Sequence, residues 1–248
     1  MRKRTIVLSI LGGLVGLAIL DGSVQMIRAD EAISGPLDLT GVTRLEVTGA
    51  ASDIVISTRG DGAREAVLTG TRRGWGALWR SAWFSPGCAR QGRMGRDGTT
   101  LTVDMGDRGG FFGWNDLDDC TLTLDATLAP DVAVSINQNA ARMRLDGDFS
   151  SIDVSSDAGD FSLVGHATRV AVDGAALRAR LTFDRVMRNE AVLVSGTMLD
   201  ASIRFLVPTT ISYGVDAVAS YVDSALANTP GAQPAITIRG EMVHATIR

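Results

Sequence analysis

The sequence is poor in the residues that usually build catalytic and metal sites. It has two histidines, two cysteines and one lysine among 248 residues. His166 and His244 stand alone, without a second His or Cys at metal-ligand spacing, so we expect each at a surface or turn position. No nucleophile elbow, zinc-protease motif or phosphate-binding glycine loop is present. The sequence therefore predicts a protein that is not an enzyme and that carries no metal or cofactor.

Amphipathic helical periodicity is also missing, except near the N-terminus and in one tryptophan-rich segment. This argues against α/β folds. At the N-terminus, three basic residues precede an apolar run over residues 5–20. Sixteen residues are many for a signal-peptide core and few for a membrane span. We therefore expect residues 1–29 to be either a cleaved signal peptide or an uncleaved N-terminal membrane anchor, and the rest to be exported.

The charge of the exported part excludes one class of partner. The whole chain has a formal net charge of −4. Residues 1–29 carry four positive charges and one negative, so the remainder has a net charge near −7. A body this acidic argues against nucleic acid as the partner.

What the sequence does contain is an internal repeat of paired short strands. In each copy two inward apolar residues are followed, nine positions later, by two more. Successive copies start roughly 18 to 22 residues apart. The pairs are Leu45/Val47 with Ile54/Ile56, Val134/Ile136 with Met143/Leu145, Ile152/Val154 with Phe161/Leu163, Val170/Val172 with Ala179/Leu181, Val192/Val194 with Ala201/Ile203, and Ile236/Ile238 with Ala245/Ile247.

This pattern predicts an all-β chain. Period-two alternation places one apolar row inward and one polar row outward, and the intervening Gly, Asn and Asp residues suit tight turns. One copy cannot bury its apolar row alone, whereas copies stacked in succession can. We therefore predict a β-solenoid over residues 36–248, with coils of about 18–22 residues that each pair with the next. A β-sandwich of hairpins is the alternative. An unpaired terminal coil could also support self-association.

Residues 120–165, CTLTLDATLAPDVAVSINQNAARMRLDGDFSSIDVSSDAGDFSLVG, resemble the bacterial putative adhesin family with DUF4097-type, head-GIN-like β-repeats. The copy IDVSSDAGDFSL at 152–163 matches the family pattern best, and later copies lose its Gly-Asp pair. The resemblance covers about residues 40–71 and 100–248. It implies a β-solenoid outside the cytoplasm and supplies no catalytic residues.

Aspartates provide the one enzymatic alternative. Asp157, Asp160, Asp173 and Asp184 could approach one another on neighbouring coils, as stacked carboxylates do in carbohydrate-cleaving β-helices. The simpler interpretation is that these residues form turns and solubilise the surface. The alternative requires an exposed groove that holds two or more of the carboxylates.

All four tryptophans lie in a segment that interrupts the repeat, at residues 72–118. Trp75, Trp79 and Trp83 recur every four residues and predict one face of a short helix. Seven arginines and three aspartates give residues 72–114 a net charge of +4. We select as a candidate interaction surface the residues Trp75, Trp79, Arg80, Trp83, Phe111, Phe112 and Trp114.

Three roles for this aromatic surface remain open. It could cap the N-terminal end of the solenoid, dock on a membrane surface, or bind an envelope protein or glycan. Cys88 and Cys120 flank most of the segment. An even cysteine count in an exported chain favours a disulfide between them, and two free, buried thiols are the alternative.

Together these features predict a non-enzymatic exported protein that acts in adhesion, envelope scaffolding or surface interaction. It would lie in the periplasm or at the cell surface, with or without an inner-membrane tether. Two alternatives are a carbohydrate-active β-helix enzyme and a periplasmic sensor or regulator of envelope stress.

Overall fold

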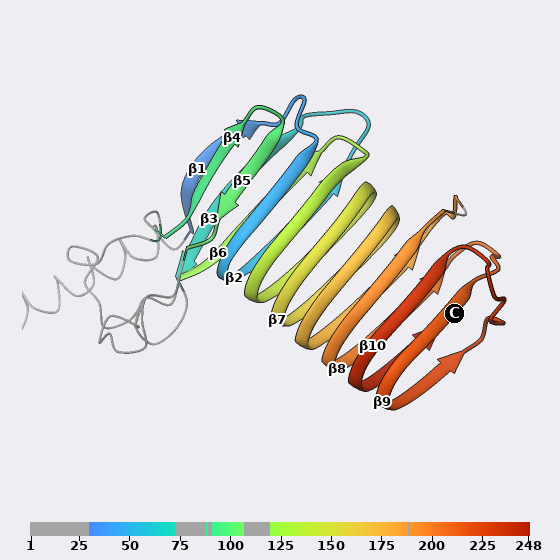
Figure 1. Cartoon of the computed structure of the whole chain (residues 1–248). Helices are drawn as coiled ribbons and strands as arrows, with labels where there is room; N and C mark the ends of the chain where they lie inside the picture. Colours follow the sequence, from blue (N-terminus) through green and yellow to red (C-terminus); the bar gives the residue numbers. More distant parts are fainter. Residues whose placement is uncertain (1–29, 73–87, 89–90, 107–119, 188) are drawn as a thin grey trace, which may run out of the picture.

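The computed structural model describes residues 30–72, 88, 91–106, 120–187 and 189–248. These residues are all-β, as predicted (Figure 1). Their strands are β1 (Asp30–Asp38), β2 (Arg44–Thr58), β3 (Glu65–Arg72), β4 (Arg93–Asp97), β5 (Thr100–Asp104), β6 (Cys120–Leu128), β7 (Val132–Phe183), β8 (Ala191–Phe205), β9 (Ser212–Ser224) and β10 (Ala235–Ile247). No helix within the described ranges could span a bilayer. The predicted signal or anchor at residues 1–29 lies outside them.

Most strands are stacked in parallel and in register. The 52-residue β7 bends repeatedly, so that its turns lie one above another between β2 and β8 (Figure 1). Val134 is the register partner of Leu45, and Val170 is the partner of Val192. Ile236 in β10 is in turn the partner of Val192. These are the equivalences that the repeat predicted.

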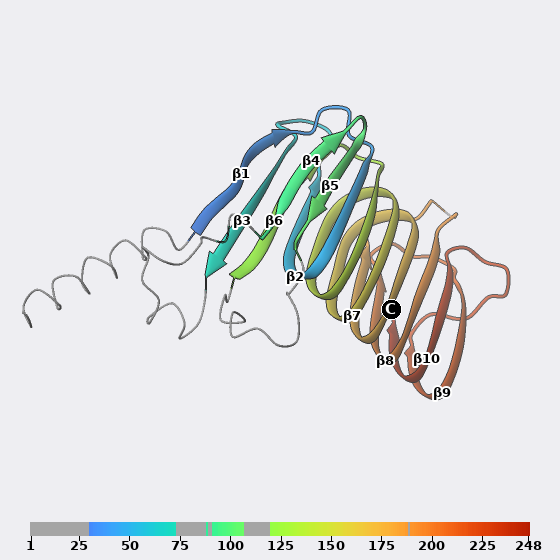
Figure 2. The ribbon, with the colours of Figure 1, turned by 60° about the vertical axis from the view of Figure 1, so that its left-hand side comes forward.

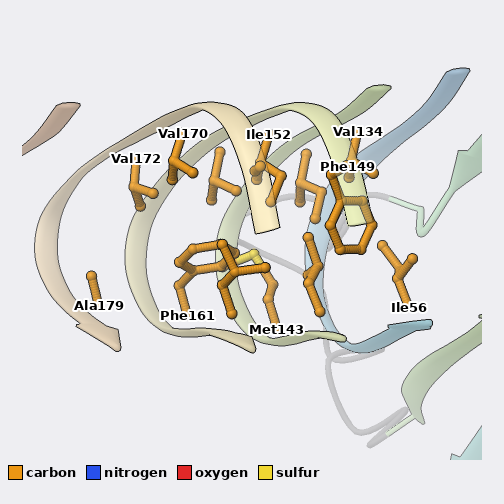
Figure 3. Close-up of a cluster of buried hydrophobic side chains, with 14 of the residues drawn as sticks. Ile56, Val134, Met143, Phe149, Ile152, Phe161, Val170, Val172 and Ala179 are labelled. Carbon is orange, nitrogen blue, oxygen red and sulfur yellow. The ribbon is translucent and has the colours of Figure 1, made fainter. Parts of the chain in front are cut away.

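The inward rows form one continuous hydrophobic core along the stack. Met143, Phe161 and Ala179 lie toward the inside of successive turns, opposite Ile152 and the valines of the facing strands (Figure 3). Burial of this row is the main stabilising contribution, because each turn covers the apolar row of its neighbour. Phe149, Phe161 and Phe183 are among the largest fully buried side chains of this core.

A column of glycines marks the corner at which the turns approach most closely. Gly174, Gly196 and Gly240 are register partners on successive strands. A Cβ atom at Gly196 would lie 2.5 Å from the carbonyl oxygen of Gly174, closer than real Cβ atoms approach a backbone oxygen. Cβ atoms at Gly174 and Gly240 would likewise meet the carbonyls of Ser156 and Gly196. The corner therefore requires glycine for lack of space.

The order of the last strands differs from the predicted succession of coils. β10 pairs in parallel with both β8 and β9, so the spatial order is β8-β10-β9 and β9 is the terminal strand. Side-chain composition gives the physical reason. Isoleucines form much of the inward row of β10, at Ile236, Ile238 and Ile247, whereas the corresponding row of β9 ends in Ser220 and Ser224. The more apolar strand takes the more buried place.

The N-terminal end is not a regular continuation of the stack. β1 and β3 pair antiparallel with each other, and β3 pairs antiparallel with β6 (Figure 2). The predicted insert at residues 72–118 contains two strands of the sheet. β4 and β5 pair antiparallel with each other, and β5 also pairs in parallel with β2. Leu101 and Val103 alternate with polar residues and are buried in the core. Residues 93–104 of the predicted insert thus contribute strands to the sheet, and the bounds of the insert stay a prediction.

Candidate functional site

A groove of about 810 Å³ crosses the outside of the stack. It lies just after the glycine corner and crosses β7, β8, β10 and β9. Register pairing brings three rows of side chains to it, one residue from each strand. The rows are Ala176, Met198, Met242 and Ala219; Leu177, Leu199, Val243 and Ser220; and Arg178, Asp200, His244 and Tyr221.

The middle row belongs to the buried core. Leu177, Leu199 and Val243 point inward, with at most 5% of each residue exposed, so they lie behind the groove and offer it little surface. Met198 and Met242 lie on the outer side of the sheet and are 50% and 54% exposed, which is unusual for large apolar side chains. Methionine is flexible and polarizable, so two exposed methionines form an adaptable surface for apolar groups.

The third row forms a ladder of polar contacts along one side of the groove. Arg178 donates from Nε to Oδ2 of Asp200 over 3.0 Å. Nδ1 of His244 lies 3.1 Å from Oδ1 of Asp200, and the His244 ring stacks on Tyr221 with centroids 5.6 Å apart. Asp160 at the other end of the groove is paired with Arg180 over 2.8 Å. The charges of the ladder are thus paired with one another.

These contacts fix the ionisation of Asp200. Burial acts to raise the pKa of its carboxyl group, but hydrogen bonds from His244 and Arg178, together with their charges, hold that pKa below its usual value. The side chain is therefore a carboxylate at neutral pH. A general acid needs a raised pKa, so Asp200 is suited to orienting its neighbours and to accepting hydrogen bonds.

The aspartates behind the enzymatic alternative divide between two faces. Asp160 lines the groove, whereas Asp157 and Asp173 line a separate depression of about 400 Å³ on the other side of the glycine corner. Asp173 accepts a hydrogen bond from Ser195 over 2.7 Å. Asp184 lines neither hollow. Within the described residues no cluster of His, Cys, Asp and Glu could hold a metal ion.

The prediction for His166 was wrong. This residue is buried, and its Nε2 lies 3.1 Å from Oε1 of Glu190, which is completely buried. The Glu190 carboxylate also accepts from the backbone N–H groups of Met187 and Asn189. The pair therefore fixes the loop between β7 and β8. His244 lies on the surface as expected, with a side chain that is 56% exposed.

The predicted disulfide is present. Cys88 and Cys120 are bonded, with Cα atoms 5.8 Å apart, and Cys88 is buried against Gly70. The residues selected as an interaction surface lie outside the described ranges: Trp75, Trp79, Arg80, Trp83, Phe111, Phe112 and Trp114. Their role in capping, membrane contact or partner binding therefore stays a prediction.

Sequence reasoning did not find the groove, although a signal was present. Met198 and Met242 occupy outward positions where the repeat otherwise carries polar or small residues. Two such exceptions at equivalent places of two copies indicate a shared apolar patch. Their adjacency could not be inferred, because it depends on β10 lying beside β8.

The fold and the groove define an all-β protein with an exposed, largely apolar groove. The sequence matches no protein-family model and no curated protein. Crystal structures that resemble the chain include those of two proteins. A putative cell adhesion protein from Clostridium sporogenes ATCC 15579 has a TM-score of 0.45 at 10% identity, over 88% of this chain and 96% of its own. A putative adhesin from Bacteroides fragilis NCTC 9343 has a TM-score of 0.46 at 11% identity, over 86% of this chain and 94% of its own. Membership of the DUF4097-type family stays a prediction.

Proposed function

We propose that this chain is an exported β-solenoid that acts as a non-enzymatic interaction module, in adhesion or in envelope scaffolding. Its binding surface is the groove, and its ligand is an extended, apolar segment of a partner protein. The observation that carries the proposal is the pair of half-exposed methionines, Met198 and Met242, which are register partners on the outer face of the sheet and line the groove. A volume of about 810 Å³ is of the size that ligand sites have.

Charge pairing in the ladder favours a partner without strong charge. Arg178 and His244 both contact Asp200, so a charged ligand would have to compete with contacts that already exist. Apolar side chains of a partner would instead displace water from the exposed Met198 and Met242. A glycan is the second candidate, because the stacked Tyr221 and His244 offer an exposed aromatic face.

Export is supported by the disulfide, since such bonds persist in oxidising compartments. The register supports an orientation. Asp30 is paired with Thr71, and Arg72 is paired with Cys120, so residues 1–29 and the arginine- and tryptophan-rich segment both join the molecule at the ends of these neighbouring strands. Any N-terminal tether would therefore hold β1 and β3 toward the membrane. The groove is formed by β7, β8, β10 and β9. Of these, β8, β10 and β9 lie toward the end of the stack opposite β1 and β3 (Figure 1).

The test is a selection of random dodecapeptides displayed on phage, followed by fluorescence anisotropy of the selected peptides with three proteins. These are the parent, the double variant Met198→Glu/Met242→Glu, and the control Val164→Glu, which changes an exposed valine outside the groove. We expect apolar peptides whose affinity falls at least about tenfold in the double variant, because burial of the methionine side chains is lost. The control should bind as the parent does.

Two outcomes would contradict the proposal. Equal affinity for the parent and the double variant would place peptide binding elsewhere. If no peptide is selected, and a glycan array instead gives binding that Tyr221→Ala abolishes, the groove is a sugar site and the protein-partner proposal fails.

A further inference from the structure

The terminal strand β9 presents one edge to solvent. It is the last strand in the sheet order, and the described residues supply no strand beyond it (Figure 1). Parallel stacks usually end in an element that covers the last strand, because an uncovered edge leaves N–H and C=O groups ready to pair with another chain.

Backbone hydrogen bonds show which residues of β9 face that edge. The N–H of Ser212 bonds toward β10, to the carbonyl of Pro234, and the N–H of Ala225 bonds to the carbonyl of Ile247. Backbone groups alternate between the two edges of a strand, so the N–H and C=O groups of Tyr213, Val215 and Ala217 point away from β10, toward the free edge. By the same alternation, counted back from Ala225, so do those of Ser220, Val222 and Ser224.

Among the described residues, only the backbone groups at the beginning of this edge have hydrogen-bond partners. The side-chain amide of Asn228 accepts from the N–H of Tyr213 over 3.0 Å and donates to its carbonyl over 2.8 Å. Asn228 thus imitates a neighbouring strand at one position. From Val215 to Val222 no described segment does the same, and Val215, Ala217 and Val222 are only partly buried against the core.

We infer that a second copy of this chain completes the edge, through antiparallel pairing of β9 with β9 about a two-fold axis between Val218 and Ala219. In this register Val215 lies opposite Val222 of the second copy, and Ala217 lies opposite Ser220 of the second copy. In each pair, both residues point their N–H and C=O groups toward the free edge, so the two residues exchange two hydrogen bonds. Val215, Ala217 and Val222 pack partly against the core, so the apolar rows of the two copies would meet at the contact.

Charge and exposure favour the same register. Asp216 and Asp223 are the charged residues of β9, and they fall opposite Tyr221 and Gly214 of the second copy, so no like charges meet. Val218, at 88%, is the most exposed large hydrophobic residue described. It would lie beside the axis and lose that exposure. A two-fold contact of this kind is closed, which gives a dimer rather than a filament.

Cysteine crosslinking of the full-length chain tests the inference. Across the axis the two Val218 Cα atoms would be about 5.6 Å apart, within the range that a disulfide spans. Val218→Cys should therefore give one covalent dimer on mild oxidation, whereas Val164→Cys, also at an exposed valine, should give no covalent dimer. A rate no faster for Val218→Cys than for Val164→Cys overturns the inference. A ladder of higher oligomers overturns the two-fold arrangement.

A charge placed at the axis gives the second arm. Ala219 is exposed, so Ala219→Glu leaves the fold intact and sets two carboxylates against each other. In the Val218→Cys background it should slow crosslinking on the order of tenfold, and sedimentation should show a monomer. The control is Ala158→Glu, at an exposed position of β7 that is far from the terminal strand, and it should change neither result. Crosslinking that Ala219→Glu leaves unchanged would also refute the pairing.

Discussion

Replacement of Gly196 by alanine probes the stacking of the turns most sharply. The added Cβ atom would lie 2.5 Å from the carbonyl oxygen of Gly174, well inside the usual contact distance, and that oxygen belongs to the backbone of the neighbouring turn. The turn cannot avoid the clash by rotating a side chain. β8 must therefore move away from β7 at the corner, which lengthens the hydrogen bonds between them.

Overpacking of this kind costs about 1–3 kcal/mol of the free energy of unfolding. For a protein of this size a loss of about 2 kcal/mol lowers the melting temperature by about 4–8 °C. The matched control is Gly214→Ala in β9, where no atom lies within 4 Å of the added Cβ. Because alanine reduces the entropy of the unfolded chain, the control should be neutral or slightly stabilising.

Calorimetric melting of the two variants beside the parent, with the disulfide intact, measures the difference. If Gly196→Ala melts with the parent, or if the two variants shift alike, the turns are not packed at the corner as described. The reasoning about the glycine column would then be refuted.

Three further predictions concern the buried pair, the disulfide and the ladder. Glu190→Ala should lower the free energy of unfolding by about 3 kcal/mol, because it strands His166 and two backbone N–H groups, and Glu190→Gln should cost less in the same urea titration. Cys120→Ser should cost about 3 kcal/mol, and added reductant should lower the stability of the parent but not that of the variant. The lowered pKa of Asp200 means that its ionisation stabilises the fold above the unfolded value of about 3.8 and that this stabilisation is lost as pH falls through the lower folded value. Asp200→Asn should therefore flatten the dependence of stability on pH below about pH 4, and an unchanged acid profile would contradict the ladder.

The repeat made the pairing register predictable. Equivalent inward residues of successive copies, roughly 18 to 22 residues apart, identified which residues of one turn lie beside which of the next, as Val170 with Val192 shows. The alternation could not order the turns, because every copy shows the same period and can pair with any other. β10 lies between β8 and β9 because its inward row is more apolar: it carries Ile236 and Ile247, whereas the row of β9 includes Ser220 and Ser224.

The candidate site was less predictable, because it depends on that order. Met198 and Met242 are 44 residues apart and become neighbours through the pairing of β8 with β10. Likewise, nothing in the sequence around His166 indicates that Glu190, one turn later, forms its buried partner. The cysteine pair was predictable from number and context alone, since no other cysteine competes for either residue.

Hydrogen exchange of the full-length chain, with and without a peptide selected on it, tests most directly whether the groove is the binding surface. The account predicts slower exchange with peptide at residues 176–178, 198–200, 219–221 and 242–244, which line the groove. It predicts no change in the arginine- and tryptophan-rich residues 72–118. Protection confined to residues 72–118, with the groove segments unchanged, would contradict the account and identify the aromatic segment as the interaction surface.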